Sequence, residues 1–206
     1  MIFNQLKTWG IKAPWVLEAF ANYCRTLYTP KKFQKVAYSD FQIPLEDERN
    51  LLSPKEMARM LQAINFNQST TVLEIGTSYG FIPHILAPYF KHVISVDENE
   101  DLIKKLNRHP QHKANIRYML GNASSGWEHG GPFDLIWINH SIPFLTKDLV
   151  NSLTPKGQII VTIGNKNPMK AMSYQKKSLE WTIDQLFETH TPELPGCSHK
   201  NPFTFN

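Results

Sequence analysis

The chain has 206 residues, of which 41% are hydrophobic and 19% are charged, a composition typical of a soluble globular protein. Its formal net charge of +4 is small and dispersed, which argues against the concentrated basic face that nucleic-acid binding usually needs. The two cysteines lie far apart without metal-ligand spacing, which predicts a reducing, cytoplasmic location and no metal. No signal peptide is visible, and no apolar run is long enough to cross a membrane.

The first fifty residues are predicted to form a helical and extended segment ahead of the main domain. Apolar side chains recur at helical spacing up to residue 28, and Pro30 ends that pattern. Residues 33–50 show no period and include the acidic group Glu46-Asp47-Glu48, which indicates a partly extended connection over a cleft. We therefore expect residues 1–50 to form this segment and residues 51–206 to form an α/β domain with an irregular tail.

The stretch Ser53-Pro54-Lys55-Glu56 predicts the start of a helix. Ser53 can cap the first turn, Pro54 suits the first helical position, and Glu56 completes a capping box. Capping therefore explains Ser53 before any chemistry is assigned to it.

From residue 71 onward the chain alternates between strand and helix patterns. Strands are predicted at 72–75, 93–96, 116–120, 134–138 and 158–163, and helices at 82–89, 99–108 and 145–153. Such alternation predicts right-handed crossovers and a doubly wound, mostly parallel sheet covered on both faces. Lys166, Lys170, Lys176 and Lys177 flank an expected loop and indicate a solvated surface rather than a binding patch. Residues 178–188 are predicted to form one or two antiparallel strands, and residues 191–206 an irregular tail.

The stretch Thr71–Phe81 has the pattern of a strand, a tight turn and a helix. The strand ends in Glu74 and breaks at Gly76, and Thr77 and Ser78 precede a second glycine, Gly80. Glycine lets a ligand approach the backbone where a Cβ would clash, and the helix that follows aims its N–H groups at that ligand. The turn therefore predicts a site for a nucleotide-like ligand.

Other polar residues fall at the ends of the predicted strands, which meet at one edge of a parallel sheet. Asp97 lies about twenty residues beyond the turn, where an acid accepts hydrogen bonds from ribose hydroxyls, and the adjacent Glu98 could share that role. A helix cap is the alternative for Asp97, because a helix follows it. Asn122-Ala123 follows the third strand, and Asn139-His140 follows the fourth.

In their order, these motifs resemble those of class I S-adenosylmethionine-dependent methyltransferases. The matching stretches are Val72–Phe81, Ser95-Val96-Asp97, Gly121-Asn122-Ala123, Phe133-Asp134-Leu135-Ile136 and Pro155-Lys156-Gly157. More narrowly, Glu74-Ile75-Gly76-Thr77 with Gly80-Phe81 resembles the protein-L-isoaspartate O-methyltransferase family, as do the upstream Ala37-Tyr38-Ser39-Asp40 and Ile43-Pro44-Leu45. The chain looks more like a divergent paralogue within that family than like the repair enzyme itself.

The resemblance implies a sheet of about seven strands and a cofactor, S-adenosylmethionine, bound over the first strand, with S-adenosylhomocysteine as product. It implies the ribose on Asp97 or Glu98 and the adenine near Asn122, with Ala123 and Asn139 among the cofactor contacts. The implied substrate is a damaged protein or peptide, methylated on the carboxylate of an isoaspartyl or D-aspartyl residue. Succinimide formation from that ester then repairs the backbone.

Three positions depart from the family pattern. The family turn is Gly-Thr-Gly-Ser-Gly, so Ser78 stands where a glycine is common, and it fits if its φ is negative. Asn122 replaces an aspartate, although an amide oxygen can still accept from the adenine amino group. The family stretch Gly-Gln-Thr-Ile-Ser-x-Pro, aligned on Pro54, puts its active-site serine at Leu52, so Ser53, one residue later, is the candidate catalytic hydroxyl.

The stretch Asn139–Phe144 offers a second catalytic candidate. His140 is placed to face a substrate and could serve as a base near neutral pH, although a loop histidine is more often only hydrogen-bonded. Amino-methyltransferases carry Asn/Asp-Pro-Pro-Tyr/Phe at this place, and the paired prolines are missing here, which disfavours nucleobase N-methylation.

The sequence leaves several functions open. The chain is expected to be an S-adenosylmethionine-dependent O-methyltransferase with a protein acceptor, and neither nucleic acid nor a membrane is expected as a partner. A methyltransferase with a different, unidentified acceptor is one alternative, and a non-catalytic cofactor-binding homologue is another. An NAD-dependent oxidoreductase is weaker, because the turn lacks the Gly-x-Gly-x-x-Gly pattern.

Overall fold

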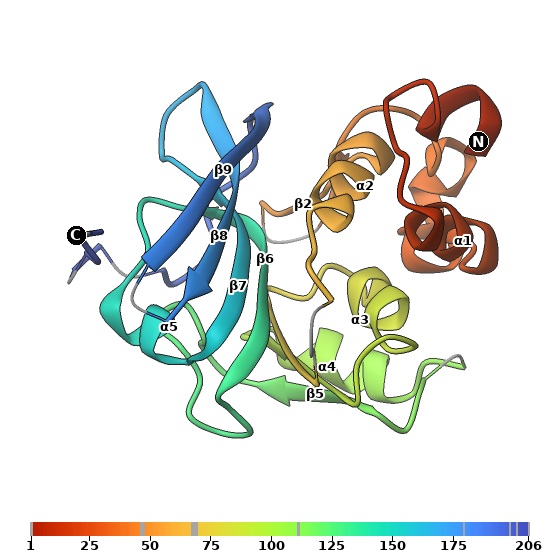
Figure 1. Ribbon diagram of the computed structural model, residues 1–206. Coiled ribbons are helices and arrows are strands. Elements are labelled where there is room, and N and C mark those ends of the chain that lie inside the picture. Colours follow the sequence, from red (N-terminus) through yellow and green to blue (C-terminus); the bar gives the residue numbers. More distant parts are fainter. Residues whose placement is uncertain are drawn as a thin grey trace.

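A seven-stranded sheet forms the centre of the computed structural model, which describes residues 2–45, 48–66, 70–110, 112–178, 180–197, 199–200 and 202–205 (Figure 1). The strands are β3 (Thr71–Ile75), β4 (His92–Asp97), β5 (Ile116–Leu120), β6 (Phe133–Ile142), β7 (Leu153–Ile163), β8 (Met169–Lys177) and β9 (Glu180–Thr189). Their order is β5-β4-β3-β6-β7-β8-β9. Neighbouring strands from β5 to β7 in this order are parallel, and β8 is antiparallel to both β7 and β9. This confirms the predicted doubly wound, mostly parallel sheet.

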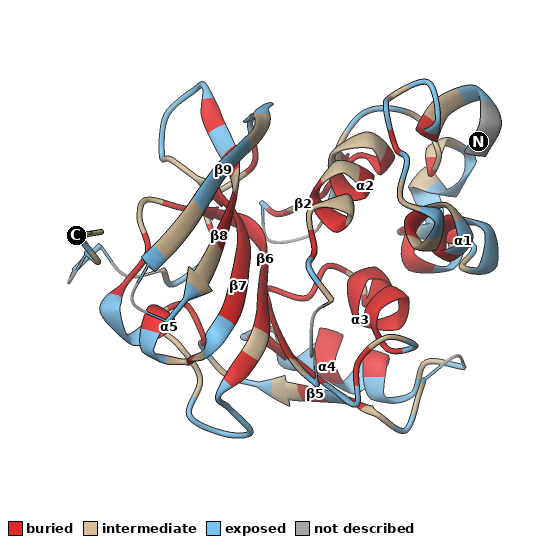
Figure 2. Ribbon diagram, viewed as in Figure 1, coloured by how far each residue is buried: buried red, intermediate tan, exposed pale blue. Residues whose placement is uncertain are grey.

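Helices on the two faces of the sheet follow from the reversal of winding between β3 and β6. The helices α1 (Pro14–Asn22), α2 (Pro54–Gln62), α3 (Phe81–Leu86) and α4 (Glu100–Asn107) pack on one face. The short helix α5 (Lys147–Asn151) and side chains of the C-terminal tail cover the other. Because neighbouring residues of a strand point to opposite faces, Val72 belongs to the first core and Leu73 to the second. Figure 2 shows the central strands as mostly buried.

The N-terminal segment contains less helix than the sequence predicts. In place of one helix through residue 28, a π-helical turn (Ile2–Leu6), α1 and two 3₁₀ turns (Arg25–Tyr28 and Lys31–Val36) follow one another. The predicted connection contains the two-residue strands β1 (Ile43–Pro44) and β2 (Asn50–Leu51), which pair antiparallel. Glu46 and Asp47 of the predicted acidic group lie outside the described residues.

Contacts across residue 50 tie this segment to the rest of the chain. Arg25 is fully buried and donates from Nε to the Ala37 carbonyl at 2.7 Å and from Nη2 to the Leu52 carbonyl. Figure 1 shows the helical part of the segment beside α2 and α3, and Gln42 Nε2 donates to the His190 carbonyl, just after β9, at 2.6 Å. The division of the chain at residue 50 stays a prediction.

The region after β7 contains a strand that the sequence does not predict. This strand, β8, includes three of the lysines expected to form a solvated surface, and it pairs with both β7 and β9. Lys170 and Lys177 are exposed, whereas Ala171 and Ser173 of the same strand are buried. Ala171 packs in the first core and Tyr174 in the second, so both faces of β8 are covered and its sequence shows no simple alternation. No helix in the described part of the chain is long and apolar enough to span a membrane.

Candidate functional site

A cavity of about 240 Å³ opens where the chain reverses its winding, at the carboxyl ends of the parallel strands. Its lining combines strand-end residues with residues that lie outside the sheet. These residues are Arg49, Ile75, Gly76, Val96, Asp97, Glu98, Asn99, Gly121, Asn122, Ala123, Ser124, Leu194 and Pro195. Of the predicted cofactor contacts, Gly76, Asp97, Glu98, Asn122 and Ala123 therefore meet in one place.

A group of buried polar and aromatic side chains lies behind the lining of the cavity. We call this group, Glu74, Ser95, Trp137 and Asn139, the floor. Asn139 Nδ2 donates to Glu74 Oε1 at 2.7 Å and to the Gly76 carbonyl at 3.0 Å, and Trp137 Nε1 donates to Asn139 Oδ1 at 2.9 Å. Ser95 Oγ donates to the second Glu74 oxygen. Glu74 and Asn139 thus hold the turn from beneath and do not line the cavity.

Burial sets the charge of this floor. Glu74 has no exposed surface, and burial raises the pKa of its carboxyl to about 7, against the opposing effect of the hydrogen bonds from Ser95 and Asn139. A carboxyl with that pKa is poised between its charged and neutral forms near neutral pH.

The glycine turn has a shape that accommodates the unusual Ser78. Positive φ falls on Gly76 (+72°), Tyr79 (+59°) and Gly80 (+79°), whereas Ser78 has no positive φ. The condition that the sequence set for Ser78 is therefore met. A Cβ on Gly76 would lie 2.8 Å from both His140 Nδ1 and Leu194 Cδ1, so this position requires glycine for space as well as for conformation. Thr77 and Ser78 are buried, and neither they nor Gly80 line the cavity.

Asp97 forms a buried ion pair that the sequence does not predict. Arg49 Nη1 donates to Asp97 Oδ2 at 2.7 Å, and the Asn99 N–H donates to Oδ1 at 2.9 Å. Burial raises the pKa of Asp97, while Arg49 acts in the opposite direction. Each carboxylate oxygen keeps a second lone pair, so Asp97 can still accept from a ligand. Because the two residues are 48 positions apart, no sequence pattern predicts this ion pair. The one sign in the sequence that this position is unusual is that Arg49 stands where the family has glutamine.

The C-terminal tail forms the opposite wall of the cavity. Asn122 Nδ2 donates to the Gly196 carbonyl at 3.0 Å, and its Oδ1 accepts from the Ser124 N–H at 2.9 Å. Ser124 Oγ also donates to the Gly196 carbonyl, at 3.2 Å. The amide nitrogen of Asn122, which was predicted to meet an adenine, thus anchors the tail, while its oxygen accepts within its own loop. We call Arg49 together with Leu194, Pro195 and Gly196 the cover of the cavity.

The two candidate catalytic residues occupy different places. His140 is fully buried against Gly76, and among the described residues neither ring nitrogen has a hydrogen-bond partner. Burial and the charge of Arg49 lower the pKa of His140 to about 3, so the ring is neutral and a weak base at neutral pH. Ser53 forms the predicted capping box with Glu56 and lies in a separate surface hollow between α2 and β9. Both catalytic roles stay predictions.

Comparison with known proteins assigns the chain and its fold to a family. The sequence profile of the protein-L-isoaspartate(D-aspartate) O-methyltransferase family matches residues 1–190. The chain belongs to this family. A protein-L-isoaspartate O-methyltransferase of Trichlorobacter lovleyi is 26% identical over 187 residues, which cover 90% of this chain and 86% of the relative. The corresponding protein of Klebsiella pneumoniae is 29% identical over 192 residues, covering 90% and 89%.

Two solved structures of this family share the fold. A protein-L-isoaspartate O-methyltransferase superposes with a TM-score of 0.79 at 20% identity, covering 95% of this chain and 65% of that chain. A Plasmodium falciparum protein assigned to the same activity, solved in complex with S-adenosyl-L-homocysteine, gives 0.77 at 20% identity, covering 94% and 96%. The family resemblance read from the sequence is confirmed. The profile ends at residue 190, so the tail that lines the cavity lies beyond the matched region.

Proposed function

We propose that this family member is a working S-adenosylmethionine-dependent O-methyltransferase that methylates the carboxylate of isoaspartyl or D-aspartyl residues in damaged proteins. The class of reaction and the cofactor follow from the family. The observation that carries the proposal for this chain is the cavity at the strand ends, with Asp97 on its wall beside the glycine turn.

The residues of the cavity suit S-adenosylmethionine. Asp97 and Glu98 offer carboxylate oxygens to the two ribose hydroxyls, which are donors that a carboxylate binds strongly. Apolar side chains of Ile75, Val96 and Ala123 offer a dry surface for an adenine ring. Gly76 lines the cavity, and a Cβ there would clash with His140 and Leu194. These roles remain proposals residue by residue.

The chain's own residues contribute positioning. When bound, the sulfonium cofactor supplies an electrophilic methyl group. Arg49 holds the Asp97 carboxylate in place, and Leu194 and Pro195 keep water from one side of the cavity. A carboxylate acceptor is already a nucleophile at neutral pH, so the reaction needs no base. The neutral His140 and the capping Ser53 are compatible with that chemistry.

A methyltransferase with a different acceptor is the second candidate. Leu52, which stands where the family has its active-site serine, is only 2% exposed and belongs to the core. It presents no hydroxyl to a substrate. An inactive cofactor-binding homologue is the third candidate, since Ser78 and Asn122 depart from the family pattern and the Asn122 amide already binds Gly196.

The same proposal includes a role in protein repair in the cytoplasm, with damaged proteins as partners and neither nucleic acid nor membrane. Cys24 is an exposed free thiol and Cys197 a partly exposed one, as a reducing compartment allows.

A methyl-transfer assay tests the proposal. The full chain is incubated with methyl-labelled S-adenosylmethionine and a peptide that contains one isoaspartyl residue, with the aspartyl peptide of the same sequence as control. We expect a base-labile methyl ester on the isoaspartyl peptide alone, and a Lys104→Ala variant on the surface of α4 should match the wild type. Cofactor binding without transfer to this peptide would support a different acceptor and contradict the proposed one.

A further inference from the structure

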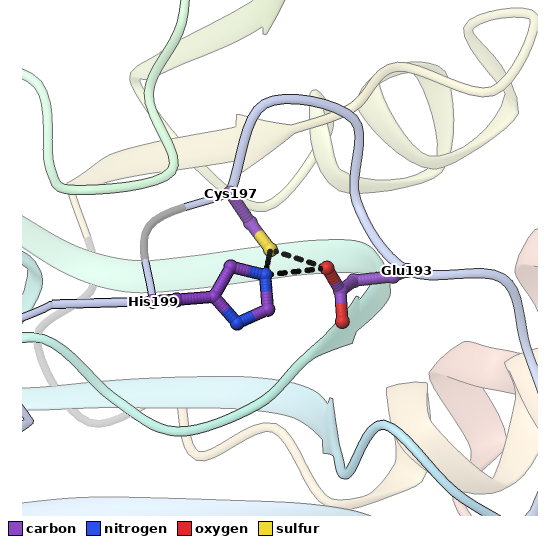
Figure 3. Close-up of side chains that lie close together, drawn as sticks. All are labelled: Glu193, Cys197 and His199. Atoms are coloured by element: carbon purple, nitrogen blue, oxygen red, sulfur yellow. Dashed lines mark hydrogen bonds and ion pairs between the residues drawn. The ribbon is translucent and has the colours of Figure 1, made fainter.

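Three metal-ligating atoms of the C-terminal tail converge beside the cover (Figure 3). Glu193 Oε1 lies 3.2 Å from Cys197 Sγ and 2.9 Å from His199 Nε2, and the sulfur and nitrogen are 4.0 Å apart. Around a tetrahedral Zn²⁺ with ordinary bond lengths, such ligand atoms are separated by about 3.3–3.6 Å. Shifts of about half an ångström would therefore bring all three atoms to zinc-binding spacing.

The backbone already holds two of these residues in place. The Ser141 N–H donates to the Pro192 carbonyl at 3.0 Å and the Leu194 N–H donates to the Ser141 carbonyl at 2.8 Å, which fixes Glu193 between them. The Cys197 N–H donates to the Leu194 carbonyl at 3.1 Å and closes a turn. Pro195 and Gly196 (φ +65°) occupy the two central positions of that turn, the sequence typical of type II. Such preorganisation lowers the cost of binding an ion.

The chemistry of the three ligands selects a class of ion. A thiolate with an imidazole and one carboxylate suits Zn²⁺ or Co²⁺ and not Mg²⁺ or Ca²⁺, which prefer oxygen alone. The Cys197 thiol now donates its hydrogen to Glu193, and that proton leaves when the sulfur binds the ion. Three protein ligands leave a fourth tetrahedral position for water. With side-chain exposures of 36% for Glu193 and 59% for His199, the ion can reach the group from solvent.

We propose that Glu193, Cys197 and His199 form a Zn²⁺-class metal site, and that the ion clasps the turn Leu194–Gly196 onto the cavity. The site lies beyond residue 190, where the match to the family profile ends. The wide separation of the two cysteines predicts no metal, so this proposed site departs from that expectation; its signal in the sequence is the spacing Glu-x-x-x-Cys-x-His. The clasp rests on the proposed function, since it assigns the cavity to the cofactor.

Cobalt titration of the full, reduced, metal-free chain tests the site. We expect a thiolate-to-Co²⁺ charge-transfer absorption that saturates at one ion per chain and disappears when Zn²⁺ is added. Cys197→Ser should abolish the absorption and His199→Ala should weaken binding about tenfold or more. Cys24→Ser, which removes the other free thiol, should leave the absorption and the Co²⁺ affinity unchanged. Absence of the absorption, or its persistence in Cys197→Ser, would overturn the site.

Two further measurements test the clasp. Zn²⁺ should slow hydrogen exchange of the Leu194 and Cys197 amides in the wild type and not in Cys197→Ser. It should also tighten S-adenosylhomocysteine binding about fivefold or more in the wild type alone. Unchanged exchange and affinity in a chain that binds Co²⁺ would overturn the clasp. A chain that binds Co²⁺ but never binds S-adenosylhomocysteine would instead contradict the proposed function and leave the metal site standing.

Discussion

The floor and the cover of the cavity are built in opposite ways. The floor consists of Glu74, Ser95, Trp137 and Asn139, all on strands of one sheet and joined by buried hydrogen bonds. The cover reaches the cavity from outside the sheet, through contacts between residues 48 and 74 positions apart in the chain. The difference teaches that topology determines the floor, whereas individual side chains determine the cover. Changes in the floor should therefore cost stability, and changes in the cover should mainly alter ligand binding.

The largest expected effect comes from removing the centre of the floor. Glu74→Ala leaves the buried donors of Ser95 and Asn139 without their acceptor and opens a cavity, so we expect the free energy of unfolding to fall by about 4 kcal/mol. Chemical denaturation measures this. Glu100→Ala, an exposed change on α4, should cost less than about 0.5 kcal/mol. Similar losses for the two variants would contradict the buried network.

The titration of Glu74 provides the next effect. Because its folded pKa of about 7 exceeds the unfolded value of about 4.3, its contribution to stability is fully present below about pH 4 and is lost as the pH rises through 7. Glu74→Gln cannot titrate. The difference in unfolding free energy, wild type minus Glu74→Gln, should therefore fall by about 3 kcal/mol between pH 4 and pH 8. A difference that does not change with pH would show that Glu74 has an ordinary pKa.

The ion pair of the cover is expected to matter less to the fold. Arg49→Leu leaves the Asp97 carboxylate without its cation beside a cavity that water can enter, so we expect a loss of about 2 kcal/mol. Asp97→Asn in the same chain should restore part of that loss. A double-mutant cycle measures the coupling, which should be about 1 kcal/mol or more. Additive effects would mean that the pair contributes nothing.

The sequence predicts the floor better than the cover, because the floor lies on strands and the cover depends on contacts between distant segments. Buried parallel strands are near-continuous apolar runs, so Val93–Val96 and Asp134–Ile138 could be placed. Asp97 ends its strand as predicted, whereas Asn139 and His140, which were predicted to follow a strand, lie within β6. The capping box at Ser53 was predicted because it is local and is confirmed. Arg49 and the tail could not be placed, because no periodicity encodes a contact between distant segments. Asn122 lies at the predicted place, although its amide binds Gly196 within the chain.

The smallest expected change in stability tests the cover by itself. A Cβ on Gly196 would come within 2.5 Å of Asn122 Nδ2 and 2.9 Å of Glu98 Oε2, whereas a Cβ on Gly10, at a similar positive φ of +84°, meets nothing within 4 Å. Each Gly→Ala change should cost about 1 kcal/mol from backbone strain. Only Gly196→Ala should also change S-adenosylhomocysteine affinity, by about threefold or more. Equal affinities in the two variants would separate the tail from the cofactor site.

Calorimetric titration with S-adenosylhomocysteine is the most direct test of the cofactor site. The account predicts one binding site per chain and an affinity at least about tenfold weaker in Asp97→Ala, a loss of about 1.4 kcal/mol or more. Lys104→Ala serves as the folded surface control. No heat from a folded wild-type chain, or an Asp97→Ala chain that binds as tightly as the wild type, would contradict the account.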